Sequence, residues 1–254
     1  MTMRGFQKAM CDLVASPDLC TKLVESPGEV LARYYLSDRD RRRLVEVVRQ
    51  PGMVVNCALY RANRLTPIYN LLSHTCFLLG DTLMNEATEF WRSYEETRLQ
   101  FDEEVERFGD FLRHRIELGV QRNPMLAEVL EYELAVNKFR FVARLEVLAG
   151  LESAKPAACT SNAIRLHPLV RVLRFRHEPD RLLELLSERW SPPYELTQGE
   201  FWLLLDGRGE ELGTKSIAPD IGRLLGAIQA GSELSLSTDD AEMLIASGLT
   251  VRSR

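Results

Sequence analysis

The sequence lacks long apolar runs, and this absence excludes a membrane-spanning chain. No segment approaches the ~20 consecutive apolar residues that a helix needs to cross a bilayer. The first residues, MTMRGFQKAMCDLVASPDL, also lack the unbroken apolar core of a signal peptide. We therefore expect a cytoplasmic protein that has no membrane partner.

Cysteine and histidine are scarce and scattered. The chain has five cysteines and four histidines, and no CxxC pair occurs. His74 and Cys76 are two residues apart, which points them to different faces of a helix. This spacing disfavours both a disulfide framework and a zinc site. We therefore expect neither a metal ion nor another cofactor in this chain.

Motifs of catalysis and of nucleic-acid binding are missing as well. There is no GxSxG, no phosphate-binding glycine-rich loop, no HExxH and no cysteine–histidine pair in a catalytic context. The formal net charge of −5 argues against a nucleic-acid partner, because such proteins usually carry a basic balance or a dense basic stripe. The residues alone favour an interaction protein that is not catalytic by itself.

What is present is an ordinary globular composition with strong helical periodicity. The chain has 254 residues, of which 45% are hydrophobic and 27% are charged. Apolar residues keep helical spacing over residues 1–150, and the alternation typical of strands begins after residue 163. We predict a mainly α protein, with a helical domain over 1–150, a linker, and a small α+β domain over 163–254.

The stretch from Leu59 to Trp91 reads as three helices separated by two breaks. Thr66 can cap a helix and Pro67 suits its first position, so we expect a break between them. Gly80 can end that helix in a left-handed conformation, and Asp81 can cap the next one. Because each helix carries an apolar face, the stretch is expected to be the hub of the helical domain.

Further helices are expected on both sides of this hub. Ser16-Pro17 separates two short amphipathic segments, and Ser37 is suited to cap a helix that ends before Pro51-Gly52. A helix is also expected from Phe101 onward.

The longest helix is expected over residues 125–148. Glu133 and Asn137 fall on or beside its apolar stripe. They are either functional groups or a buried polar pair satisfied by a neighbouring arginine, because buried polar groups are nearly always hydrogen-bonded.

Strand and hairpin signals define the C-terminal domain. The segment 169–175 alternates between apolar and basic residues, and two apolar runs flank the turn Gly207-Arg208-Gly209. Helices are expected over residues 180–188, 221–229 and 239–246. Strands and helices in this order favour a small module of winged-helix character.

Basic and aromatic side chains of this domain are the candidate peptide-binding residues: Arg171, Arg174, Arg176, Phe201 and Trp202. The arginines lie in or beside the expected strand 169–175, whose edge can accept an extended peptide. Arg171 and Arg174 point to opposite faces of a regular strand, so only one of them is expected to contact the peptide. The alternative is that the arginines protect the edge against aggregation. The hairpin strand with Phe201 and Trp202 is the second candidate.

Several short motifs occur in a characteristic order. They are LYR-x-N at 59–63, the apolar helix 67–79 with the glycine after it, Phe108-Gly109 with Phe111-Leu112, and Asn123-Pro124 before an acidic helix. In this order they resemble the family of partner subunits of multinuclear-iron TIM-barrel oxidases, first described as a DNA-binding domain. The chain has Phe108 where the family commonly has tyrosine. The resemblance covers residues 55–150.

This resemblance implies that the chain is the non-metal subunit of a heterodimeric oxidase. Members of the family act with a TIM-barrel subunit that holds the iron and uses oxygen to modify a cysteine of a ribosomally made peptide. Their C-terminal module, of the type that recognises such peptides, binds the leader part of the substrate. Known cases serve methanobactin and thiaglutamate biosynthesis, and the chain is most similar to the thiaglutamate branch.

Tyr60, Arg61, Asn63 and Arg64 are the candidate partner-binding residues, because they precede the expected break, where polar side chains can reach a partner. The alternative is that Arg61 and Asn63 only satisfy helix ends within the domain. Two other function classes were weighed. The acidic balance speaks against a DNA-binding transcriptional regulator, and the missing ligands speak against a stand-alone redox or metal enzyme.

Overall fold

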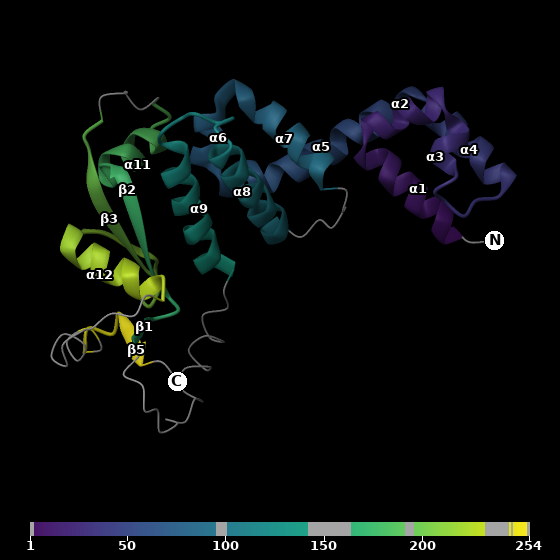
Figure 1. Cartoon of the computed structure of the whole chain (residues 1–254). Coiled ribbons are helices and arrows are strands. Elements are labelled where there is room, and N and C mark those ends of the chain that lie inside the picture. Colours follow the sequence, from purple (N-terminus) through teal and green to yellow (C-terminus); the bar gives the residue numbers. More distant parts are fainter. Residues whose placement is uncertain are drawn as a thin grey trace. The chain divides into compact units, whose positions relative to one another are not determined.

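Figure 1 shows the computed structural model, which describes residues 3–94, 101–141, 164–190, 196–231, 244 and 246–252. These residues are mainly helical, and the short strands all lie in the C-terminal part, as the sequence predicted. No helix among them is long and apolar enough to cross a membrane. The chain forms two compact units: Met1–Leu71 with Asp81–Leu112, and Leu72–Gly80 with Arg113–Arg254.

These units do not follow the expected boundary near residue 150. Residues 72–80 and 113–141 were assigned to the helical domain, yet they pack within the second unit. Residues 142–163, which include the expected linker and the end of the expected helix 125–148, lie outside the described residues.

Short capped helices build the start of the first unit: α1 (Met3–Ala15), α2 (Pro17–Glu25), α3 (Pro27–Leu31) and α4 (Asp38–Val48). The cap expected at Ser37 is present, and Ser16 caps α2 as well. Ser16 Oγ accepts a hydrogen bond from the amide of Leu19 at 3.2 Å, and Ser37 Oγ accepts one from Asp40 at 3.2 Å. Leu13, Leu23 and Leu44 bring the apolar faces of these helices into one buried core.

The helix α5 (Pro51–Leu71) continues through the position where a break was expected. The Thr66 hydroxyl donates to the Ala62 carbonyl at 2.8 Å, so it turns back into its own helix and does not cap a new one. Pro67 lies inside the helix and is buried together with Ile68. The apolar burial offsets the hydrogen bond that proline cannot donate. The predicted break between residues 66 and 67 is therefore wrong.

The break at Gly80 is confirmed, although its cap is not. α6 (Ser73–Leu79) ends at Gly80, whose φ of 50° suits a residue without a Cβ atom. Asp81 lies in a short 3-10 turn (Gly80–Thr82) and does not cap α7 (Leu83–Ser93), which has no side-chain cap. Because α6 belongs to the second unit, the stretch 59–91 is not a single hub.

An aromatic cluster joins α7 to α8 (Phe101–Glu117) in the first unit. The rings of Phe90 and Phe108 lie edge to face with their centroids 5.3 Å apart, and Phe111 lies 5.7 Å from Phe90. The motif residues Phe108 and Phe111 therefore serve the packing of these helices, as expected from their spacing.

The second unit combines α6 with α9 and the strands: α9 (Leu126–Phe141), β1 (Ile164–Leu166), β2 (Val170–His177), α11 (Pro179–Ser187), β3 (Gln198–Asp206), β4 (Gly213–Ile217), α12 (Pro219–Gln229) and β5 (Thr250–Arg252). β2, β3 and β4 form an antiparallel sheet in that order, and β1 pairs with β5. The predicted strand 169–175, the hairpin and the helices 180–188 and 221–229 are confirmed. Of the expected helix 239–246, only residues 244 and 246 are described.

Helices cover both faces of the three-stranded sheet. Successive side chains of a strand point to opposite faces, so each strand contributes to both contacts. Phe175, Leu203 and Leu205 pack with apolar residues of α9 and α11. Val172 and Trp202 on the other face pack with α12. Figure 1 shows α12 beside β2 and β3.

Glycines let α12 approach the sheet closely. A Cβ atom built on Gly222 would lie 2.1 Å from Trp202 Cγ, and one on Gly226 would lie 2.7 Å from the same indole ring. The indole therefore lies directly against the helix backbone, which fixes the distance of α12 from the sheet.

Glu133 has a structural role that the sequence did not indicate. Its carboxylate accepts hydrogen bonds from the backbone amides of His74 and Thr75, each at 2.8 Å. These are free N–H groups of the first turn of α6, so a residue of α9 caps a helix distant in sequence. The prediction that an arginine satisfies this carboxylate is replaced by these two backbone bonds.

Candidate binding surfaces

The outer edge of β2 was the expected peptide site, but side chains already occupy it. The amide group of Gln229 makes two bonds to Val172: its oxygen accepts from the backbone N–H at 2.9 Å, and its nitrogen donates to the carbonyl at 3.1 Å. A side-chain amide thus takes the place that a peptide group of an added strand would occupy. The prediction that this edge accepts a peptide is not supported by these contacts.

A carboxylate closes the same edge further along. Glu128 accepts the backbone N–H of Arg176 at 2.6 Å and contacts the imidazole of His177. Glu128 and His177 are both buried. Near the start of the strand, the N–H of Val170 donates to the His167 carbonyl at 2.8 Å. Only the outward backbone groups of Arg174 remain between these contacts.

The structure separates Arg171 from the other two candidate arginines. Arg174 is 66% exposed and lies 3.5 Å from Glu200, while Arg176 is exposed and Arg171 is partly buried. Arg171 and Arg174 point to opposite faces of β2, as their parity predicted. They are not brought together into one basic cluster.

Phe201 and Trp202 lie on β3, the central strand of the sheet, so this strand offers no free edge to an added strand. Trp202 is only 9% exposed and packs against α12, and Phe201 packs with the α9 and α11 core. Both aromatic residues therefore serve the core of the module.

The other edge of the sheet, β4, is open within the part of the chain that the structure describes. β4 pairs only with β3, and the side chains from Gly213 to Ser216 are exposed. The backbone N–H of Val172 points away from β3, toward Gln229. The residues on either side of Val172 in β2 must therefore point their backbone groups toward β3. Alternation along the antiparallel ladder then makes Lys215 face β3, so Thr214 and Ser216 point their N–H and C=O groups outward. These groups are available to an added strand.

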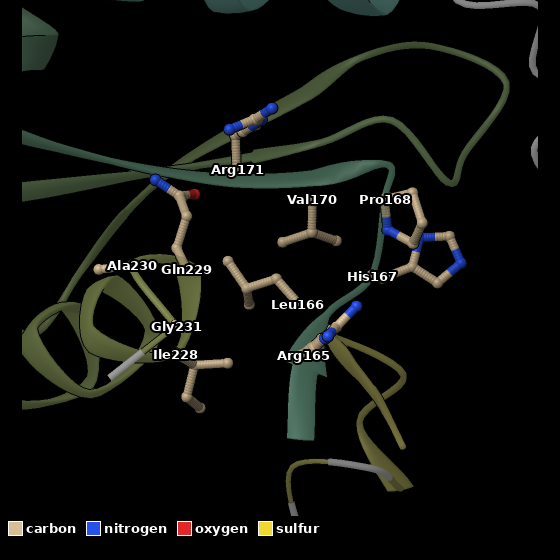
Figure 2. Close-up of a pocket in the computed structure, with 10 residues that line it drawn as sticks. All are labelled: Arg165, Leu166, His167, Pro168, Val170, Arg171, Ile228, Gln229, Ala230 and Gly231. Carbon is tan, nitrogen blue, oxygen red and sulfur yellow. The ribbon is translucent and has the colours of Figure 1, made fainter. Parts of the chain in front are cut away.

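Figure 2 shows a cleft of about 400 Å³ between the start of β2 and the end of α12. Leu166, Val170 and Ile228 surround the hollow, whereas Arg171 lies on the opposite side of β2. Partial burial and the nearby Arg208 guanidinium lower the pKa of the His167 imidazole. The lining of the cleft is of mixed polarity, because Arg165, His167 and Gln229 contribute to it beside the apolar side chains.

Most of the candidate partner-binding residues turn inward. Arg64 is buried and its Nε donates to Glu104 Oε1 at 2.6 Å. The guanidinium of Arg61 lies over the ring of Trp91, and the Tyr60 hydroxyl is buried. Asn63 alone is exposed. Arg64 and Arg61 thus hold α5 against α7 and α8 within the first unit.

The exposed side of α5 was not singled out by sequence reasoning. Its larger apolar members are exposed by 73% at Val54, 57% at Val55 and 57% at Leu59. The exposed positions of α5 also include Ala58, Ala62, Thr66 and Tyr69. No exposed residue of this helix is charged, although 27% of the chain is. We call these residues the α5 surface. The exposed positions of α5 also include Asn56, Asn63 and Asn70, so this uncharged surface is apolar only in part. A surface of this composition is compatible with a protein interface.

Among the described residues, no three histidine, cysteine, aspartate or glutamate side chains gather as ligands for a metal ion. The histidines are instead separated, with His177 against Glu128 and His74 at the start of α6. A chain without metal or cofactor stays a prediction.

Comparisons with known proteins add no family assignment. No family model matches the sequence, and no curated protein matches it. The resemblance to the oxidase partner subunits therefore rests on the order of its sequence motifs alone.

Proposed function

We propose that this chain is the non-metal partner subunit of a heterodimeric, iron-dependent oxidase that modifies a cysteine of a ribosomally made peptide. The chain supplies no iron ligand, and the TIM-barrel subunit holds the metal. The tasks of this chain are to bind the TIM-barrel subunit and to present the leader part of the peptide. The second unit, with its small sheet of winged-helix character, is the peptide-binding part.

The α5 surface is the observation that carries this proposal. A stand-alone enzyme gains nothing from exposing Val54, Val55 and Leu59, because burying such side chains is favourable by about 25 cal/mol for each Å² removed from water. A DNA-binding surface needs lysines and arginines against the phosphates, and the α5 surface has none exposed. An uncharged, partly apolar helix side suits a lasting contact with another protein.

The open edge of β4 supports the second task. Thr214 and Ser216 offer backbone groups to an extended peptide, and main-chain hydrogen bonds give affinity without demanding one sequence. The edge of β4 takes the place of the edge of β2 as the proposed peptide site, because Gln229 and Glu128 occupy the latter.

Co-purification with the TIM-barrel protein encoded beside this chain tests the proposal. We expect a stable complex with all iron in the barrel subunit when the two chains are separated and analysed. Leu59→Glu places a charge on the α5 surface without disfavouring the helix, because glutamate is a good helix former. It is expected to weaken the complex at least about tenfold, since buried unpaired charges are costly.

Val120→Glu is the matched control, because Val120 is also an exposed apolar residue but lies outside α5. It should leave the affinity unchanged. Equal binding by the parent chain and Leu59→Glu would remove α5 from the interface. Iron retained by this chain without the barrel protein would refute the non-metal role.

A further inference from the structure

Two cysteines from distant parts of the sequence meet at the end of α1. Cys20 of α2 donates a hydrogen bond from Sγ to the Leu13 carbonyl at 3.0 Å. Cys57 of α5 donates to the same carbonyl oxygen with an Sγ to O distance of 3.6 Å. Because both sulfurs contact one carbonyl oxygen, they are neighbours, and each thiol uses its single S–H proton in its bond to that carbonyl.

Helix capping explains part of this arrangement. The Leu13 carbonyl lies in the last turn of α1, where carbonyl groups have no partner within the helix. One thiol already satisfies this need, since Cys20 makes the shorter bond. The second thiol places two oxidisable sulfurs side by side, and both are in the reduced form.

A small molecule can reach the pair. Cys20 and Cys57 line one cavity of about 380 Å³, together with Val24, Met53 and Val54. The cavity lies next to the α5 surface, because Val54 belongs to both. Chemistry at the thiols therefore acts at the base of that surface.

We propose that Cys20 and Cys57 are a modification site that forms a reversible disulfide, with a low-molecular-weight disulfide such as oxidised glutathione as the oxidant. Cys20 loses its proton and attacks one sulfur of the oxidant, which breaks the S–S bond and releases one thiolate. Cys57 then loses its proton and attacks the Cys20 sulfur, which releases the second thiolate. Two electrons pass to the oxidant, and the two protons end on the released thiols.

The environment keeps the dithiol as the resting state. Burial and the neighbouring Cys57 thiol raise the pKa of the Cys20 thiol to about 12, so little thiolate is present at neutral pH. The first attack is therefore slow, and the site responds to sustained oxidation. Once formed, the bond ties α2 to α5 and restricts the helix that carries the α5 surface. This inference does not depend on the proposed oxidase partner.

The test is incubation of the reduced full chain with oxidised glutathione, followed by non-reducing peptide mapping and thermal unfolding. We expect one linked peptide containing Cys20 and Cys57, a loss of two titratable thiols from the five of the chain, and a rise in Tm of about 5 °C or more. Reduction with excess thiol should reverse all three changes.

Cys20→Ser and Cys57→Ser should each abolish the rise in Tm. Cys11→Ser is the control, because Cys11 is exposed on α1 and should leave the rise intact. A map dominated by glutathione adducts or by pairs with other cysteines would overturn the proposal. So would an oxidised chain without the Cys20–Cys57 peptide, a result that stands whether or not the serine variants fold.

Discussion

The two edge strands of the three-stranded sheet, β2 and β4, differ in whether side chains cover their outer backbone groups. β2 is closed by side chains from two helices, with Gln229 of α12 on Val172 and Glu128 of α9 on Arg176. In β4 the backbone groups of Thr214 and Ser216 point outward, and among the described residues no second strand pairs with them, while the Ser216 hydroxyl bonds to Asp180. Both are edge strands, and only their helical neighbours distinguish them.

This difference shows that side chains of neighbouring helices can determine which edge strand is available for pairing. An edge strand is a template for pairing, so proteins block the edges that they do not use. Glu128 also contacts the buried His177, which makes the block part of the core. The open edge is short and carries only Lys215 as a charge. An edge left open in this way can pair with an added strand.

The largest expected effect comes from removing the carboxylate that closes β2. Glu128→Ala leaves the N–H of Arg176 and the buried His177 ring without their partner, so we expect a loss of about 3 kcal/mol in the free energy of unfolding. Urea unfolding of the full chain measures it. Glu131→Ala is the control, because Glu131 pairs with Arg113 at a half-exposed site and should cost less than about 1 kcal/mol. Equal losses for the two variants would contradict the distinction.

A methyl group at Gly222 should displace the helix that carries Gln229. The new Cβ atom meets Trp202 at 2.1 Å, so α12 must move away from the sheet. We expect Gly222→Ala to cost about 2 kcal/mol, since overpacking outweighs the gain in helix propensity. Gly28→Ala has open space around its Cβ and should be neutral or slightly stabilising. A stable Gly222→Ala chain would show that the contact with Trp202 does not set the helix position.

Removing the amide that mimics a strand should have a moderate effect. Gln229→Ala leaves both outward groups of Val172 unpaired, and we expect a loss of about 1–2 kcal/mol. Gln229→Glu keeps the acceptor for the Val172 N–H but loses the donor to its carbonyl, so it should fall between the parent and Gln229→Ala. If Gln229→Ala unfolds like the parent, the two bonds do not stabilise the edge.

The smallest effect on stability is expected at the open edge. Thr214→Pro removes an outward N–H without touching the ladder to β3, so it should change the free energy of unfolding by less than about 0.5 kcal/mol. Binding of the substrate leader, measured by calorimetry, should fall at least about fivefold. Thr214→Ala keeps the N–H and should bind as the parent does. Unchanged binding by Thr214→Pro would move the peptide site away from β4.

Local signals in the sequence were sufficient for most of the elements. Ser16 and Ser37 cap the helices that follow them, and Gly80 ends α6, because these effects depend on a few neighbouring residues. Pro67 does not break α5 as its local cost predicts, because burial, which depends on residues far along the chain, offsets that cost. The candidate sites were harder to predict for the same reason. From the sequence alone, Arg64 is expected to be an exposed cation. The structure shows that it is buried and paired with Glu104.

By itself, the sequence determined the mainly helical class, the hairpin of β3 and β4, and the opposite facing of Arg171 and Arg174. Periodicity and strand parity are properties of short segments, so they depend little on the tertiary arrangement. The tertiary structure alone decided that α6 packs with α9, that β2 is closed and β4 is open, and that Cys20 lies beside Cys57. Those outcomes depend on which distant side chains meet, and contacts of that kind are set by the packing of whole faces.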